Sequence, residues 1–176
     1  MMLLYYFSMN NWINYDDHLL GLRYLDKDAI LQILDQAKPL RSELGRDVKQ
    51  VPTLRGKTIL HFFAEPSTRT RVSFEMAAKA IGAQTISMNA DSSSLTKGES
   101  LFDTVKNLEA LGVDAIVVRH RNGGAPHFMA EMANIPIINA GDGYHEHPTQ
   151  GLLDLFTMRE VAGDLSGKKV LICGDI

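Results

Sequence analysis

The most polar turn of the chain, FAEPSTRTR at residues 63–71, has the residue types that bind an anion. Ser67 stands where a helix would begin. The unpaired backbone N–H groups of that first turn would point outward at the positive end of the helix dipole. These groups belong to Thr68, Arg69 and Thr70. A capped, solvated helix start is the alternative, but two arginines in a first turn oppose the dipole unless an anion lies there.

A second polar segment, NADSSSLTKGES at residues 89–100, is long for a routine connection and has no hydrophobic periodicity. It offers the hydroxyl groups of Ser92, Ser93 and Ser94 and the mobile charge of Lys97. This set suits a phosphate at a loop tip. A flexible, serine-rich surface loop is an equally favoured interpretation.

Two further groups of polar residues follow apolar runs. Arg119 and His120 come directly after DAIVV, and His147 and Gln150 follow the turn after IPIIN. We expect them at the same edge of a parallel sheet as Ser67, where such sheets bind ligands. Arg119 could bind a phosphate or an oxyanion, His147 could donate to a carbonyl oxygen, and Gln150 could bind an amide. A surface ion pair and structural histidines are the alternatives.

Other kinds of chemistry lack their signatures. The run His145-Glu146-His147 resembles a metal cluster, but alternate residues of an extended chain point in opposite directions, and no further ligand has a telling spacing. The sequence contains no GxGxxG after a strand, no GxxxxGK[ST] and no GxSxG. We therefore expect no metal and no organic cofactor.

Strand-like and helix-like segments alternate along the chain, which predicts an α/β fold: a three-layer sandwich with a parallel sheet flanked by helices on both faces. Strands are expected at 57–64, 84–88, 114–118 and 135–139, and helices at 68–81, 101–111, 125–133 and 148–162. An earlier helix begins after Asp26, a plausible N-cap, and should bend or end at Pro39. Ser100 and Asp103 have capping-box spacing.

The 176 residues, 45% hydrophobic and 22% charged, are enough for one globular domain. A net charge of -3 gives no basic surface for a nucleic acid, and no apolar stretch approaches the length of a membrane span. The single cysteine, Cys173, lies in an apolar run and is expected to be a buried thiol, which fits a cytoplasmic protein.

Taken together and in this order, FFAEPSTRTR, SSSLTKGES, VVRHRNGG and NAGDGYHEHPTQ resemble the carbamoyl phosphate site of the aspartate carbamoyltransferases. The resemblance extends over residues 18–176. STRTR and HPTQ also occur in ornithine and related carbamoyltransferases. Glu65 and the run Lys97-Gly98-Glu99 are typical of the aspartate branch.

The resemblance implies a role for each matching residue. Four residues would hold the phosphate: Ser67, Thr68, Arg69 and Thr70. Arg119 would bridge the phosphate and the carbonyl oxygen, which Thr70, Arg119 and His147 would polarise, while Gln150 would bind the carbamoyl amide. Ser93 and Lys97 would serve the adjacent subunit of a homotrimer. Ser92 and Ser94 remain alternatives to Ser93.

The resemblance also implies a domain organisation and a reaction. Residues 1–17 would be an N-terminal extension, 18–162 the carbamoyl phosphate-binding domain, and 163–176 a linker with the first strand of a missing aspartate-binding domain. The reaction would be carbamoyl transfer from carbamoyl phosphate to L-aspartate, in pyrimidine biosynthesis, with little or no turnover by this chain alone. An ornithine acceptor and a non-catalytic anion-binding or assembly module are alternatives, and a regulatory subunit is left open.

Overall fold

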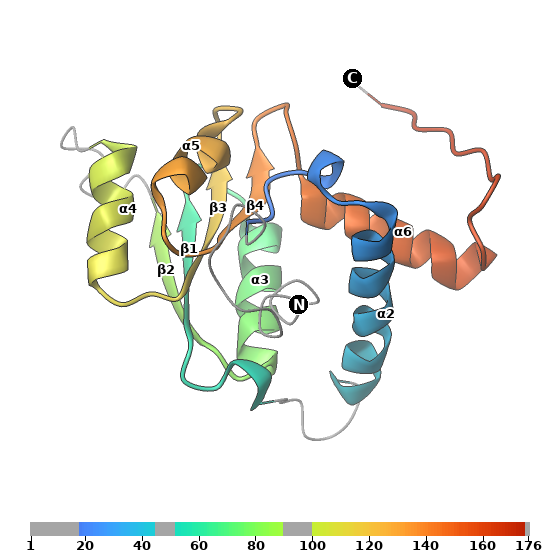
Figure 1. Cartoon of the computed structure of the whole chain (residues 1–176), viewed down its shortest axis with the longest axis horizontal. Coiled ribbons are helices and arrows are strands. Elements are labelled where there is room, and N and C mark those ends of the chain that lie inside the picture. The colour runs from blue at the N-terminus through green and yellow to red at the C-terminus, as the bar shows by residue number, and fades with distance from the viewer. Residues whose placement is uncertain (1–17, 45–51, 90–99, 175–176) are drawn as a thin grey trace.

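The structure is a computed structural model that describes residues 18–44, 52–89 and 100–174. Its centre is a parallel sheet with the strand order β2-β1-β3-β4 (Figure 1). The strands are β1 (Thr58–Phe63), β2 (Gln84–Asn89), β3 (Ala115–His120) and β4 (Ile137–Asp142). Three of them are short apolar runs, as strands covered on both faces must be. All four confirm the predicted strands to within a few residues.

Helices cover both faces of this sheet. One face carries α2 (Lys27–Leu44), α3 (Thr68–Ala80) and α6 (Pro148–Ala162), and the other carries α4 (Leu101–Ala110) and α5 (Ala125–Met132). The short 3-10 helices η2 (Leu22–Tyr24) and η3 (Pro52–Leu54) complete the described elements. Among the helices described, none combines the length and the apolar character that a bilayer span requires.

The hydrophobic core lies in two layers, because alternate side chains of a strand point to opposite faces. Ile59 and Phe63 of β1 pack in one layer with side chains from α2, α3 and α6. Leu60 and Phe62 pack in the other layer with side chains from α4 and α5. This arrangement confirms the predicted three-layer α/β sandwich.

Two predicted helix starts are confirmed, and of the two outcomes predicted at Pro39, a bend or an end, the end is wrong. Asp26 Oδ1 accepts the Ala29 N–H at 2.7 Å, and Ser100 forms the expected capping box with its partner three residues on. However, α2 continues through Pro39 to Leu44. The side chain of Leu40 is buried, so packing on the far side of the proline offsets the lost backbone hydrogen bond.

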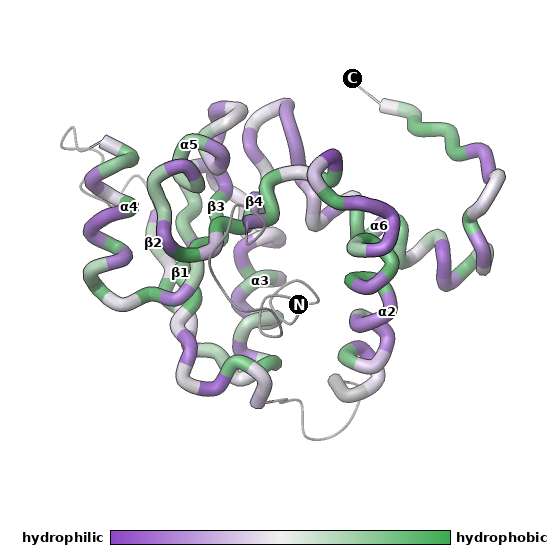
Figure 2. Tube along the Cα trace, viewed as in Figure 1, coloured by the Kyte–Doolittle hydropathy of each residue, from purple (hydrophilic) through white to green (hydrophobic). Residues whose placement is uncertain are grey.

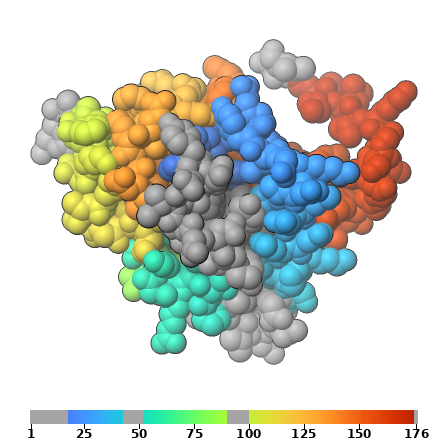
Figure 3. Space-filling view, viewed as in Figure 1, coloured from blue at the N-terminus to red at the C-terminus, as the bar shows by residue number. Residues whose placement is uncertain are grey.

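The segment after α6 differs from the prediction. Residues 167–174 include no strand, and Leu171 is 91% exposed. Figures 2 and 3 show this largely hydrophobic segment running away from the body of the molecule. Cys173 is exposed with it, so the predicted buried thiol is wrong as well. A strand needs a neighbour to pair with its backbone, and no described residue lies beside this segment as a partner.

Candidate anion-binding site

The strand order reverses its direction between β1 and β3. From β1 the chain moves outward through α3 to β2, and it then returns past β1 to form β3. Helix α3 after β1 and helix α5 after β3 therefore leave neighbouring strands toward opposite faces of the sheet. The Ala64 N–H donates to the Arg119 carbonyl at 2.8 Å, which keeps the two strand ends side by side. Open α/β sheets bind ligands at such reversals of strand order.

An open cleft of about 290 Å³ lies at the carboxyl end of β1. Its lining includes Ser67 and Thr68 at the start of α3, both predicted from the sequence. It also includes Glu65 from the turn between β1 and α3, Arg71 of α3 and Asn89 at the end of β2, which bring charge and hydrogen-bonding groups. The cleft therefore places polar side chains beside the positive end of a helix dipole.

The side chain of Ser67 does not cap the backbone N–H groups in the first turn of α3. Ser67 stands at the N-cap position but forms no side-chain hydrogen bond to the helix backbone. Its hydroxyl instead donates to Thr70 Oγ1 at 2.9 Å. Capping by Ser67, the alternative interpretation of this turn, is thus absent. The N–H groups at an uncapped helix start need a partner, and an anion is a suitable one.

Arg119 lies at the end of β3, where it is fixed by two hydrogen bonds. Nη2 donates to Glu65 Oε1 at 3.1 Å, and Nη1 donates to the Ala140 carbonyl at 3.1 Å. Its Nε is buried and has no hydrogen-bond partner among the described residues. The guanidinium is therefore held in a fixed position beside Glu65, which lines the cleft and neutralises part of its charge.

A glycine lets Arg119 and His147 approach each other. Gly141 has a φ of 114°, and a Cβ there would lie 2.4 Å from Arg119 Nη1 and 3.4 Å from His147 Cδ2. Any side chain at this position would displace the guanidinium. Arg119, at the end of β3, and His147, after β4, therefore both pack against Gly141.

The surroundings of His147 favour the neutral form of its imidazole. Burial lowers the pKa of His147 below its ordinary value, and the nearby Arg119 charge lowers it further. His147 Nδ1 lies 3.1 Å from Thr149 Oγ1. A neutral imidazole can donate one hydrogen bond to a substrate oxygen without carrying a charge of its own.

The remaining predicted residues are less closely gathered. Gln150 is exposed, and its Nε2 donates to Asp154 Oδ1 at 3.0 Å, so its amide faces its own helix. Arg69 is exposed on the first turn of α3. His120 Nδ1 accepts the Asn122 N–H at 3.0 Å, which favours its structural interpretation. Ser93 and Lys97, with the alternatives Ser92 and Ser94, lie outside the described residues.

Arg71 lines the cleft, whereas from the sequence it was only one of the two arginines of the turn and had no specific role. Its Nη1 donates to Asn89 Oδ1 at 3.2 Å, and its Nε lies 3.8 Å from Glu75 Oε1. The available signal was its spacing, since Arg71 follows Ser67 by four residues and therefore shares its face of the helix. Arg69, two residues earlier, lies on a different face.

The turn between β4 and α6, which carries His147, is organised around Asp142. This carboxylate is fully buried. Its oxygens accept hydrogen bonds from Asn139 Nδ2 at 3.0 Å and from the N–H groups of Gly124 and Glu146 at 2.7 and 3.0 Å. Burial acts to raise the pKa of Asp142, but these hydrogen bonds and one to His145 hold it below its usual range. These hydrogen bonds hold the turn that leads to His147 in one conformation.

Comparison with known sequences identifies relatives along most of the chain. Residues 17–160 match the family model for the aspartate/ornithine carbamoyltransferase, carbamoyl-P binding domain. The aspartate carbamoyltransferase catalytic subunit of Desulforudis audaxviator is 55% identical over 159 residues, covering 90% of this chain and 52% of the relative. That of Carboxydothermus hydrogenoformans is 57% identical, covering 90% and 51%. The chain thus spans about half the length of these curated relatives.

Solved structures give the same result. The catalytic subunit of M. jannaschii aspartate transcarbamoylase superposes with a TM-score of 0.79 at 43% identity, covering 86% of this chain and 49% of that one. The Trypanosoma cruzi aspartate transcarbamoylase, solved with carbamoyl aspartate and phosphate, gives 0.80 at 30% identity, covering 86% and 48%. By sequence and by fold, the chain belongs to the aspartate/ornithine carbamoyltransferase family, through its carbamoyl-P binding domain.

Proposed function

We propose that this chain supplies the carbamoyl phosphate site of an aspartate carbamoyltransferase, which transfers the carbamoyl group to the amine of L-aspartate. The observation that carries the proposal is the uncapped start of α3, which opens onto a cleft at the carboxyl end of β1. The relatives named above, all of them aspartate carbamoyltransferases, support aspartate over ornithine as the acceptor.

The phosphate group would bind at the start of α3. Its oxygens would accept hydrogen bonds from the backbone N–H groups and the hydroxyls of the first turn, contributed by Ser67, Thr68, Arg69 and Thr70. Arg71 faces the same cleft and would add positive charge. The dipole and the arginines would together hold the leaving group in a defined orientation.

The carbonyl oxygen would lie between Arg119 and His147, which meet above Gly141. As the amine attacks, negative charge develops on this oxygen, and donors fixed in advance stabilise it. Gln150 would turn from Asp154 to accept a hydrogen bond from the carbamoyl amide and would thereby fix its plane. Thr70 would add a further donor to the carbonyl oxygen.

The reaction that follows needs no nucleophile from the protein. The amine nitrogen forms a bond to the carbonyl carbon, the bond from that carbon to the phosphate oxygen breaks, and the amine proton passes to the leaving phosphate. The products are N-carbamoyl-L-aspartate and phosphate, which would serve pyrimidine biosynthesis. The protein contributes orientation and electrostatic stabilisation of the transition state.

Full activity would require parts beyond one chain. Ser93 and Lys97, which by the resemblance reach a neighbouring subunit, make a homotrimer the assembly we propose. The acceptor L-aspartate would bind mostly outside this domain, since the chain spans only about half of its relatives' length. We further propose a cytoplasmic location, which the single cysteine of the chain supports.

The proposal can be tested by fusing the chain to the remaining half of the Carboxydothermus hydrogenoformans relative. We expect this fusion to carbamoylate L-aspartate and the chain alone to show little or no transfer, because the acceptor site is then absent. Ornithine serves as the control acceptor. A fusion that folds and binds carbamoyl phosphate, but transfers to ornithine or to neither amine, would contradict the proposal.

A further inference from the structure

Three side chains that the carbamoyl transfer does not use converge beside the turn that supports His147. They are His127 of α5, Asp142 at the end of β4 and His145 three residues further along the turn. One possible ligand atom from each lies within 4.8 Å of the other two. From this geometry we propose that the chain binds a Zn²⁺ ion through His127, Asp142 and His145.

His127 is the residue that most needs an explanation. Both of its ring nitrogens are buried, and neither has a hydrogen-bond partner among the described residues. Its ring lies edge-on to the ring of His145, with the ring centroids 5.5 Å apart, and edge-on to the ring of Tyr24, with the centroids 5.7 Å apart. A buried polar nitrogen without a partner costs stability, and coordination of a metal ion by one nitrogen would remove part of that cost.

Asp142 provides a fixed, charged ligand. It is fully buried, and donors from Asn139, Gly124 and Glu146 hold its two oxygens in place. Metal-binding carboxylates typically have such supporting hydrogen bonds, which orient the ligand before the ion arrives. Oδ2 already lies 3.1 Å from His145 Nδ1. A carboxylate oxygen and an imidazole nitrogen are therefore in near contact on one side of the cluster.

The donor set favours zinc. Two imidazoles and one carboxylate bind Zn²⁺ at about 2.0 to 2.2 Å in tetrahedral sites that leave one position for water. Ligand atoms in such a site lie about 3.3 to 3.5 Å apart, so a cluster within 4.8 Å needs only a modest closing of its side chains. His145, with 39% of its side chain exposed, has room to move and leaves access for the ion and the water.

The sequence predicts no metal site, and its one metal-like run does not correspond to this cluster. In the run His145-Glu146-His147, the two histidines are separated, since His147 lies against Arg119 above Gly141. Glu146 lies 3.8 Å from Arg23 Nε in an ion pair. The second imidazole comes instead from His127, on the preceding helix, where no local spacing could indicate it.

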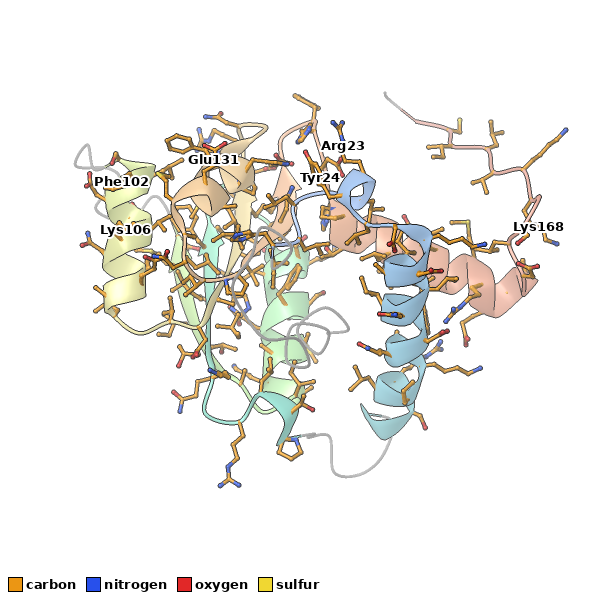
Figure 4. The ribbon with its side chains drawn as sticks, in the orientation of Figure 1. Arg23, Tyr24, Phe102, Lys106, Glu131 and Lys168 are labelled. Carbon is orange, nitrogen blue, oxygen red and sulfur yellow. The ribbon has the colours of Figure 1, made fainter. Side chains whose placement is uncertain are left out.

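A bound ion would connect two elements that support the candidate anion-binding site. It would tie α5 to the turn between β4 and α6, and that turn carries His147. Arg23 and Tyr24, labelled in Figure 4, contact this region from η2 through the Glu146 ion pair and the His127 ring. The ion would therefore stabilise the turn and would take no part in carbamoyl transfer.

The test uses residues 1–176 without an affinity tag, freed of metal by a chelator. We expect one Zn²⁺ to bind per chain in calorimetry, and one Co²⁺ to give the visible absorption bands of a tetrahedral nitrogen and oxygen site. H145Q, at a partly exposed position, and H127Q should each lose the bands and weaken zinc binding at least about tenfold. H120Q is the matched control, because His120 lies outside the cluster.

Thermal unfolding supplies a second measurement that does not depend on activity. Zn²⁺ should raise the melting temperature of the wild type and of H120Q, and it should leave that of H145Q unchanged. Absence of stoichiometric zinc binding by the wild type would overturn the proposal, and so would zinc binding that H145Q retains in full. Carbamoyl phosphate binding, measured on the same samples, separates a failure here from a failure of the proposed function.

Discussion

At the scale of single residues, the site depends on the pairing of Arg119 with Glu65. Both side chains are partly buried, and Arg119 also donates to the Ala140 carbonyl. The guanidinium is thus held in position before any ligand binds. An entering phosphate would compete with the Glu65 carboxylate for the same charge, so the two residues should have opposite effects on affinity.

Replacement of Arg119 tests the cationic side of this pair. Arg119→Gln should lower the affinity of the chain for carbamoyl phosphate by about 10- to 100-fold, because a charge-assisted hydrogen bond contributes about 1.5 to 3 kcal/mol. Isothermal titration calorimetry measures the change. Arg55→Gln, at an exposed turn outside the cleft, is the control and should bind as the wild type does. Equal affinities in all three proteins would remove Arg119 from the site.

Replacement of Glu65 tests the anionic side. Glu65→Gln should strengthen phosphate binding by about two- to fivefold, equivalent to about 0.4 to 1 kcal/mol, which is the upper part of the range for a partly exposed ion pair. The cause is that Arg119 loses a competing carboxylate and keeps its bond to the Ala140 carbonyl. Competition between phosphate and carbamoyl phosphate in the same calorimetric assay would show the gain. Weaker binding by the variant would mean that Glu65 orients Arg119 more than it competes.

At the scale of elements, the packing of β1 against α3 contains a buried histidine. His61 is fully buried beside Phe74, with ring centroids 6.5 Å apart, and neither ring nitrogen has a partner among the described residues. Burial lowers the pKa of His61 to about 4, which the charges of Glu75 and Lys79 modify in opposite directions. The layer that positions the start of α3 therefore requires a neutral imidazole.

This histidine predicts an acid-sensitive fold. Because the pKa of His61 is lower in the folded chain than its ordinary value of 6.5, its contribution is complete above pH 6.5 and is lost as the pH falls toward 4. At pH 4.5 the loss should be about 2 to 3 kcal/mol. Urea unfolding of the wild type and of His61→Leu at pH 7 and pH 4.5 isolates this loss, since other groups titrate in both proteins. Parallel pH dependences would contradict the prediction.

At the scale of the whole molecule, the proposed function requires a neighbouring subunit. Two inactive forms of the fused enzyme, Lys97→Gln and His147→Gln, should regain activity when their subunits are mixed. Each hybrid trimer would contain one site with both residues intact, so random mixing restores about a quarter of the wild-type sites. Activity assays after mild dissociation and reassembly measure this recovery. A mixture as inactive as its components would place Lys97 outside the neighbour's site.

The sequence predicts most of the fold because its signals are local. Short apolar runs mark β1, β3 and β4, and glycines that follow the helices mark the ends of α3, α4 and α6 to within a few residues. The errors arise where a partner decides the structure. Pro39 remains helical because Leu40 packs in the core, and the run at 170–173 is not a strand because no described strand lies beside it.

The candidate site divides in the same way. Ser67, Thr68 and Thr70 are close together in sequence, so one strand-to-helix turn reveals them. The contact of Glu65 with Arg119 joins residues 54 positions apart, and no spacing rule indicates it. The position of Gln150 also follows from a contact, its bond to Asp154, which the sequence alone does not specify.

The most direct measurement for the central claim is a titration of the chain with carbamoyl phosphate, followed through the amide signals of its ¹⁵N-labelled backbone. A phosphate held by the start of α3 should shift the N–H signals of Thr68, Arg69 and Thr70 most strongly, in a saturable manner, and Arg119→Gln should weaken the response. Saturable binding that leaves these three signals unchanged, or no binding at all, would contradict the claim that this helix start is the carbamoyl phosphate site.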